Sequence, residues 1–267
     1  MGTTRLAAVT PIHRAPALHA ACVSASANTN VAKCPTNCST CNLHEVCLPC
    51  GLSGLELERL DNLVYTRKRI KRGESLYQAG DPFKSLYAIR SGFFKTCILH
   101  DDGREQVAAF HMAGEIMGMD GIGTEHHNLN AVALEDSEVC VIVFASLEQA
   151  SSEMRGLQHA FNKVMSREIV RNQGVMMLLG TMRAEERLAM FLLNLSQRFM
   201  ARGYSPLEFH LRMTRDEIGS YLGLKLETVS RAFSSFQQGG LVSVQQKHIR
   251  ILDMPGLKRM VGQHLAN

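Results

Sequence analysis

The sequence predicts an α+β protein with an N-terminal antiparallel β-barrel of the jelly-roll type, a long helix and a C-terminal winged helix-turn-helix. Short β-type runs alternate with glycine turns up to residue 144. A helical pattern follows over 147–182, and two short helices then surround Gly223 ahead of two strand-like runs. The expected order is a disordered leader (1–33), a cysteine-rich segment (34–51), the β-barrel sensor domain (52–146), the long helix (147–183) and the winged domain (184–267).

Charge is distributed unevenly along the 267 residues. Residues 187–267 hold 11 Lys and Arg against 5 Asp and Glu, whereas residues 1–186 hold 18 against 20. This basic C-terminal third predicts a polyanionic partner. No apolar run approaches the roughly 18 residues of a membrane span, so no membrane partner is expected. The leader shows no clear arginine-rich repeat or apolar h-region, and it is interpreted as disordered rather than as a transit peptide.

The most informative stretch is rich in cysteine, because five of the eight cysteines lie within 34–50. Cys38 and Cys41 are two residues apart, so one turn can aim both sulfurs at one ion or cluster, and Cys47 follows closely enough to close the same loop. A disulfide staple is disfavoured, since no secretory signal is seen and the chain is long enough for a core. The spacing leaves zinc and an iron–sulfur cluster level, with a thiol-based redox role as a third alternative.

A short amphipathic helix is expected over 52–61, ahead of the β-type runs. We expect strands at 74–78, 86–90, 93–99, 106–111 and 139–144. Cys97, inside one of these strands, is interpreted as a buried small hydrophobe. The adjacent His126 and His127 are expected to be exposed rather than to ligate metal.

The long helix carries a narrow seam whose residues recur at steps of 4, 3, 4 and 3, the heptad spacing by which two helices pair. The seam consists of Met165, Ile169, Asn172, Met176 and Leu179. Packing of this stripe on the helix's own barrel is the alternative. The narrow seam favours pairing, as does the amide of Asn172, whose hydrogen bonds the same residue of a second chain can satisfy. We therefore expect a homodimer.

The helix-turn-helix is recognised from its caps and its breaks. An amphipathic helix over 186–202 ends at Gly203. Thr214 and Glu217 then form a capping box that opens the first helix of the motif. A second helix resumes near Leu226, and strands at 241–244 and 249–252 follow as a wing.

The second helix presents an ordered polar face. Glu227, Ser230 and Arg231 stand at i, i+3 and i+4, which places them on one side. Arginine reads guanine bidentately, glutamate accepts from cytosine and serine adapts to several base edges. Lys225 and Lys247 flank this face as expected phosphate contacts. A small helical hairpin without DNA binding is the alternative, but a solvated helix would not require such an order.

Four segments together carry a family resemblance: Ser-Leu-Tyr-Ala-Ile-Arg-Ser-Gly at 85–92, Ala-Leu-Glu-Asp-Ser-Glu-Val-Cys at 133–140, Ala-Glu-Glu-Arg-Leu at 184–188 and Tyr-Leu-Gly-Leu-Lys-Leu-Glu-Thr-Val-Ser-Arg at 221–231. With them the chain resembles the cyclic AMP receptor protein superfamily and, within it, the fumarate and nitrate reduction regulator (FNR) group. The resemblance extends from about 34 to 252 and implies a cyclic-nucleotide-binding-like sensor domain.

The resemblance implies an oxygen-sensing transcription regulator of the cytoplasm. In that group a 4Fe–4S cluster supports a homodimer that binds palindromic double-stranded DNA with TTGAT-like half-sites and meets RNA polymerase. Three family ligands spaced Cys-x2-Cys-x5-Cys fall on Cys38, Cys41 and Cys47, and the fourth, in a Leu-Glu-x-Ser-x-Val-Cys segment, falls on Cys140. Relatives would place the polymerase contact in exposed loops such as 92–95.

Other functions are disfavoured by what the sequence lacks. Cyclic-nucleotide binders follow a Gly-Glu with an Arg-Ser or Arg-Thr that holds the phosphate, but after Gly114-Glu115 the next arginine is Arg155. We therefore expect no cyclic nucleotide. Cys50 does not belong to the family spacing. No Ser/His/Asp order, phosphate loop or paired-carboxylate motif stands out, so no enzyme is predicted, and a zinc-stapled protein-interaction module is the alternative from another class.

Overall fold

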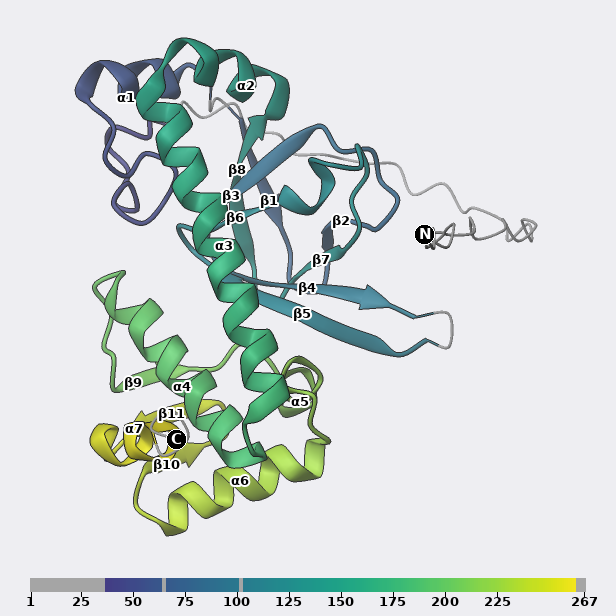
Figure 1. Ribbon diagram of the computed structural model, residues 1–267, viewed down its shortest axis with the longest axis vertical. Coiled ribbons are helices and arrows are strands. Elements are labelled where there is room, and N and C mark those ends of the chain that lie inside the picture. The colour runs from purple at the N-terminus through teal and green to yellow at the C-terminus, as the bar shows by residue number, and fades with distance from the viewer. Residues whose placement is uncertain (1–36, 64–65, 101–102, 263–267) are drawn as a thin grey trace, which may run out of the picture.

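The computed structural model describes residues 37–63, 66–100 and 103–262. The expected leader (1–33), which contains Cys22, and Cys34 of the cysteine-rich segment lie outside the described residues. The described part of the chain starts with the cysteine turns and α1 (Gly54–Asp61), continues through a β-domain, and follows the long helix α3 (Arg155–Thr181) to a C-terminal domain at the opposite end (Figure 1). No helix of the described chain is long and apolar enough to cross a membrane.

The strands of the N-terminal domain form two antiparallel four-stranded sheets. One has the order β1 (Thr66–Ile70), β8 (Ser137–Val143), β3 (Ser85–Ser91) and β6 (Ile116–Met117). The other has the order β2 (Ser75–Tyr77), β7 (Asn130–Ala133), β4 (Phe93–Leu99) and β5 (Glu105–Met112). Apolar side chains of both sheets, among them Ile89, Phe94 and Val139, form a shared core. The predicted jelly-roll domain is confirmed, and its described strands form two sheets rather than one closed barrel.

Each of the five predicted strands is present to within two residues, whereas β1, β6 and β7 are additional. The strand β1, Thr-Arg-Lys-Arg-Ile, was missed because its sequence shows no apolar alternation. Its charged side chains have partners across the sheet instead. Arg69 faces Glu138 of β8, with 3.7 Å between Nε and Oε1. The strand β6 has only two residues, too few for alternation to mark it, and in β7, Asn-Ala-Val-Ala, apolar residues do not alternate with polar ones.

The long helical region consists of two helices. A short helix, α2 (Phe144–Glu153), is separated from α3 by Met154, whose ψ of 99° is extended. In the 27 residues of α3 only Leu157, Ala160 and Leu178 are buried. A helix this long with so few buried residues leaves most of its surface available to a partner.

The C-terminal domain is the predicted winged helix-turn-helix, with a third wing strand and a last helix that the sequence did not reveal. Its core includes Ile218, Val229 and Phe233. The turn needs Gly219, because a Cβ there would lie 2.6 Å from the carbonyl oxygen of Leu224. The elements are α4 (Ala184–Met200), β9 (Glu208–His210), α5 (Arg215–Leu222), α6 (Leu226–Gln238), β10 (Val242–Gln245), β11 (His248–Ile251) and α7 (Met254–Gly262).

Two expectations of exposure are wrong. His127 is buried, because its ring stacks on Tyr77 at 3.8 Å between centroids, whereas His126 is exposed as expected. Residues 93–95 are also buried, because they belong to β4 and pair with β5 and β7. They do not form an exposed loop for RNA polymerase. Cys97 is buried, as predicted.

Candidate metal centre and DNA-reading face

The cysteine segment is a series of tight turns anchored at one end. The amide of Cys41 donates to the carbonyl of Cys38 at 3.3 Å, and that of Cys47 donates to Leu43 at 3.0 Å. Asp61, the last residue of α1, accepts from the backbone of Cys38 and, at 2.7 Å, from the hydroxyl of Ser39. The carboxylate thus holds the start of the loop against α1.

The four family-type cysteines converge on one small cavity of about 30 Å³. Cys38, Cys41 and Cys47 reach it from the loop, and Cys140 reaches it from β8, where it pairs with Ala88 of β3. Cys50 does not line this cavity. The remaining walls are mainly apolar and include Leu48, Leu60, Ile89 and Ile142.

The convergence is incomplete. In the part of the chain that the structure describes, no three His, Cys, Asp or Glu side chains already form a group that could hold a metal ion. Cys140 belongs to a strand paired on both sides, whereas the other three cysteines belong to turns. Cys140 is therefore held by the sheet, whereas the other three cysteines are held by local turns. The donor set itself, four thiols in an apolar pocket, fits a soft metal or an iron–sulfur cluster.

Burial and mutual repulsion disfavour free thiolates here. Burial, and then the neighbouring Cys47 and Cys140, raise the pKa of Cys38 to about 12. Burial likewise raises the pKa of Cys47 to about 12 and that of Cys140 to about 11. The positive charge of Arg90 opposes the effect of burial on Cys140 by lowering its pKa. The Nη1 atom of Arg90 also lies 3.9 Å from the sulfur of Cys41. The site thus favours neutral thiols unless a cation binds the sulfurs, with arginine charge available to balance an anionic assembly.

The middle of the α3 seam is exposed in the described chain. Ile169 is 55% exposed and Met176 is 73% exposed, and the side chain of Asn172 is also exposed. Met165 and Leu179, at the two ends of the seam, are half-buried. Burial within the described chain covers only the ends of this stripe, and Leu179 packs against the core cluster that includes the C-terminal domain. The exposed remainder has the width that a second helix covers.

On α6 the predicted polar triplet lies opposite the buried face formed by Val229, Phe233 and Phe236. Glu227 and Arg231 are exposed, and Arg231 Nε donates to the carbonyl of Glu227 at 3.4 Å. Ser230 is half-buried. The helix is therefore held in the domain by one side and presents the other to solvent.

The two lysines differ. Lys225 is the exposed residue that precedes α6. Lys247, in the wing, is half-buried, and its Nζ donates to the carbonyl of Arg212 at 3.0 Å. Lys247 must therefore share or exchange this bond to contact a phosphate, whereas the Lys225 side chain has no such bond within the described part of the chain.

Arg215 belongs to this face, although the sequence reasoning missed it. Its guanidinium lies 5.4 Å from the centre of the Phe233 ring, and its Nη1 donates to the hydroxyl of Ser230 at 3.3 Å. The available signal was an arginine in the first turn of α5, where the helix dipole favours acidic residues. An arginine at that position is unfavourable for the helix dipole, and its contact with Ser230 explains its presence there.

The sheet that contains β4 and β5 also contacts the helix-turn-helix. Lys95 of β4 forms an ion pair with Glu217 of α5, with 3.0 Å between Nζ and Oε1. The amide of Val107 in β5 donates to the hydroxyl of Ser220 at 2.8 Å. The β4–β5 hairpin therefore lies directly against the first helix of the motif, an arrangement visible in Figure 1.

Comparison with known proteins agrees with this architecture. A model described as a Crp-like helix-turn-helix domain matches residues 186–260, and one described as a cyclic nucleotide-binding domain matches residues 67–153. The chain is 49% identical to the transcriptional regulatory protein btr of Bordetella pertussis over 85% of this chain and 94% of the relative. It is 44% identical to the fumarate and nitrate reduction regulatory protein of Escherichia coli over 88% of this chain and 93% of the relative.

The chain belongs to the FNR group of the cyclic AMP receptor protein/FNR superfamily. Its fold is also similar to that of FixK2 from Bradyrhizobium japonicum, with a TM-score of 0.67 and 30% identity over 73% of this chain and 96% of that one. In this FNR-group chain the match to the cyclic nucleotide-binding domain covers residues 67–153, which include Cys140. The loop with Cys38, Cys41 and Cys47 precedes the matched residues, so three of the four cysteines of the candidate centre lie outside that domain.

Proposed function

We propose that this FNR-group protein is an oxygen-responsive transcription regulator of the cytoplasm. Cys38, Cys41, Cys47 and Cys140 would hold a 4Fe–4S cluster that promotes a homodimer. The dimer would bind palindromic promoter DNA with TTGAT-like half-sites in the absence of oxygen and would act on RNA polymerase. The observation that carries this proposal is the meeting of four cysteines, from two distant parts of the chain, at one apolar cavity.

The surroundings of the sulfurs support a cluster over a structural zinc site. When bound, the cluster would supply oxygen-sensitive iron–sulfur bonds that tie the loop to β8. Arg90 beside Cys41, with the charge of Arg67 acting on Cys140, would balance an assembly of four thiolates and iron. Leu48 and Leu60 would limit access of water to the same point. Asp61, through its bonds to Cys38 and Ser39, would keep the first ligand in place.

The DNA contacts follow from the exposed side of α6. Arg231 would read a guanine, Glu227 would accept from a cytosine, and Ser230, oriented by Arg215, would contact a neighbouring base. Lys225 and Lys247 would bind phosphates. A homodimer paired through the exposed seam of α3 would place two such helices about one turn of DNA, roughly 10 base pairs, apart.

Cyclic nucleotide is not proposed as a ligand, even though a cyclic nucleotide-binding model matches the sensor domain. The carboxylate of Glu115 is already bound by guanidinium groups of the chain itself. Asp120 accepts from the amide of Asn128 at 2.8 Å and faces His127. An anionic cyclic phosphate would meet these groups without the arginine that nucleotide binders provide.

The test is anaerobic purification followed by iron and sulfide analysis, an absorption spectrum, and DNA binding before and after exposure to air. We expect iron and sulfide in equal amounts, a coloured protein, and DNA binding that air abolishes. A colourless protein with one zinc would overturn the cluster and favour the zinc-stapled module. A metal-free protein whose DNA binding responds to thiol oxidants would favour the thiol-based regulator.

A further inference from the structure

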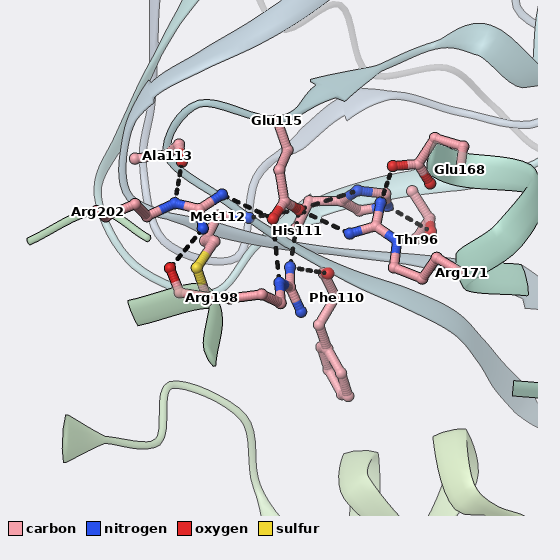
Figure 2. A network of polar contacts seen from close by, with 10 residues as sticks. All are labelled: Thr96, Phe110, His111, Met112, Ala113, Glu115, Glu168, Arg171, Arg198 and Arg202. Carbon is pink, nitrogen blue, oxygen red and sulfur yellow. Dashed lines mark hydrogen bonds and ion pairs between the residues drawn. The ribbon is translucent and has the colours of Figure 1, made fainter. Parts of the chain in front are cut away.

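A single carboxylate, that of Glu115, is surrounded by three arginines (Figure 2). Its Oε1 accepts from Arg198 Nε at 3.0 Å and from Arg202 Nη2 at 2.8 Å. Its Oε2 accepts from Arg198 Nη2 at 2.7 Å and from Arg171 Nη1 at 3.0 Å. The side chain of Glu115 is only 13% exposed. Charge-assisted bonds of this number and burial are among the strongest polar contacts a protein forms.

The three arginines come from outside the sensor domain. Arg171 belongs to α3, directly before Asn172 of the seam, and Arg198 and Arg202 belong to the helix α4 and the turn that follows it. Two of them also bind sensor backbone: Arg198 donates to the carbonyl of Phe110 at 2.7 Å, and Arg202 donates to that of Ala113. Glu115, in the turn between β5 and β6, thus joins the sensor domain to the long helix and to the DNA-binding domain at one point.

The same turn touches the cysteine loop on its other side. Gly114, the neighbour of Glu115, has a φ of +86°, and a Cβ there would lie 2.6 Å from Cγ2 of Val46. Val46 immediately precedes Cys47. Cys41, Ala113 and Arg202 also line one shared cavity. Any movement of the loop that repositions Cys47 therefore acts directly on the turn that holds Glu115.

The charges in this network are unequal, so the carboxylate is indispensable to it. Three guanidinium groups face two carboxylates, those of Glu115 and Glu168. Burial lowers the pKa of His111 to about 3, so the nearby imidazole is neutral and adds no charge. Although burial opposes ionisation of Glu115, its arginine neighbours hold its pKa far below the usual range. Removal of the Glu115 charge would leave three guanidinium groups with the single carboxylate of Glu168 in a largely buried site.

We propose that Glu115 is the positioning residue that transmits the state of the cysteine loop to both α3 and the DNA-binding domain. The inference rests on the proposed function, because it assigns the route by which a filled cysteine site favours the DNA-binding dimer. Val46 fixes the turn on the loop side, and Glu115 fixes Arg171 next to the seam and Arg198 and Arg202 below it. Its role is in coupling rather than in ligation.

The experiment compares the parent protein with Glu115→Gln, which keeps the shape of the side chain and removes its charge. Iron content, the anaerobic spectrum, the fraction of dimer and DNA affinity are measured with and without air. We expect Glu115→Gln to keep the iron and the spectrum of the parent. Its anaerobic DNA affinity should fall at least tenfold, so that air then changes little. Glu115→Asp, which keeps the charge, should restore part of the response, and Glu125→Gln, at an exposed loop, should behave as the parent.

The outcomes separate the two proposals. Suppose that the parent and Glu115→Gln bind DNA with equal affinity without air and that both lose DNA binding in air. This result would overturn the role of Glu115 and leave the proposed function standing. A parent without iron would overturn both. If Glu115→Gln does not fold, Arg171→Gln decides the matter, because it removes only the α3 arm of the network. A parental response to air in that variant would also overturn the inference.

Discussion

The two functional regions of this protein are built in different ways. The DNA-reading face is made within one short segment, because α6 is held by its own apolar side and presents Glu227 and Arg231 on the other. The candidate metal centre is made of two segments almost a hundred residues apart, whose four cysteines line one small cavity. Each substitution on the DNA-reading face should therefore remove only part of the DNA affinity. Each substitution of a cysteine ligand should abolish metal binding altogether, because all four ligands are needed to hold the metal.

The largest expected effect is at the cysteines. Serine at any one of Cys38, Cys41, Cys47 or Cys140 should abolish iron binding and lower anaerobic DNA affinity at least tenfold, because a hydroxyl is a poor ligand for a soft metal. Iron analysis and DNA binding under nitrogen measure this. Cys50→Ser is the matched control, since Cys50 shares the loop but not the cavity. Loss of iron in Cys50→Ser with its retention in Cys47→Ser would show that the ligand set is wrong.

A second large effect is expected at the seam, which links the two regions. Asn172→Leu should give a dimer that binds DNA in air, because an amide at such a position costs stability that an apolar residue does not. Asn172→Asp should weaken the dimer, since two facing carboxylates must repel or take up a proton. Sedimentation of the metal-free protein is the measurement. Gln173→Leu adds the same side chain off the seam, and an Asn172→Leu variant as monomeric as this control would exclude Asn172 from the switch.

The DNA-reading face should show smaller, graded losses. Arg231→Ala should cost about 1–3 kcal/mol of binding free energy and relax the preference for guanine at one position. Selection of binding sites from random DNA, followed by titration, measures both. Gln237→Ala, at the exposed far end of α6, should leave affinity and sequence preference unchanged. Unaltered base preference in Arg231→Ala would show that another side chain reads that base.

The smallest effect is expected at the phosphate contacts. Lys225→Ala should weaken binding to all sequences nearly equally and reduce the slope of log affinity against log salt by about one. Lys247→Ala should do less, because its Nζ is already bound to the carbonyl of Arg212. Titrations at several salt concentrations distinguish the two. A change of sequence preference in Lys225→Ala would move this lysine from the phosphates to the bases.

The sequence by itself determined the features that depend on neighbours along the chain. The capping box of Thr214 and Glu217 is formed as predicted, with the Glu217 amide donating to the Thr214 hydroxyl at 3.1 Å. The buried side of α6 and the exposed seam of α3 also follow from residue spacing, because a helix repeats its faces at fixed intervals. The loop of Cys38, Cys41 and Cys47 was recognisable because these cysteines are close together in the sequence. Cys140 was assigned only through resemblance to a family, since no local pattern singles it out.

Only the tertiary structure decided which distant groups meet. Arg171, Arg198 and Arg202 lie 56, 83 and 87 residues from Glu115, and nothing in their local spacing indicates a shared carboxylate. The burial of His127 against Tyr77 was missed for the same reason. Periodicity reveals which side of an element turns inward, but the partner on that side depends on how the elements pack. In this protein the helices and the cysteine turns are local properties, and the connection between them is a property of the fold.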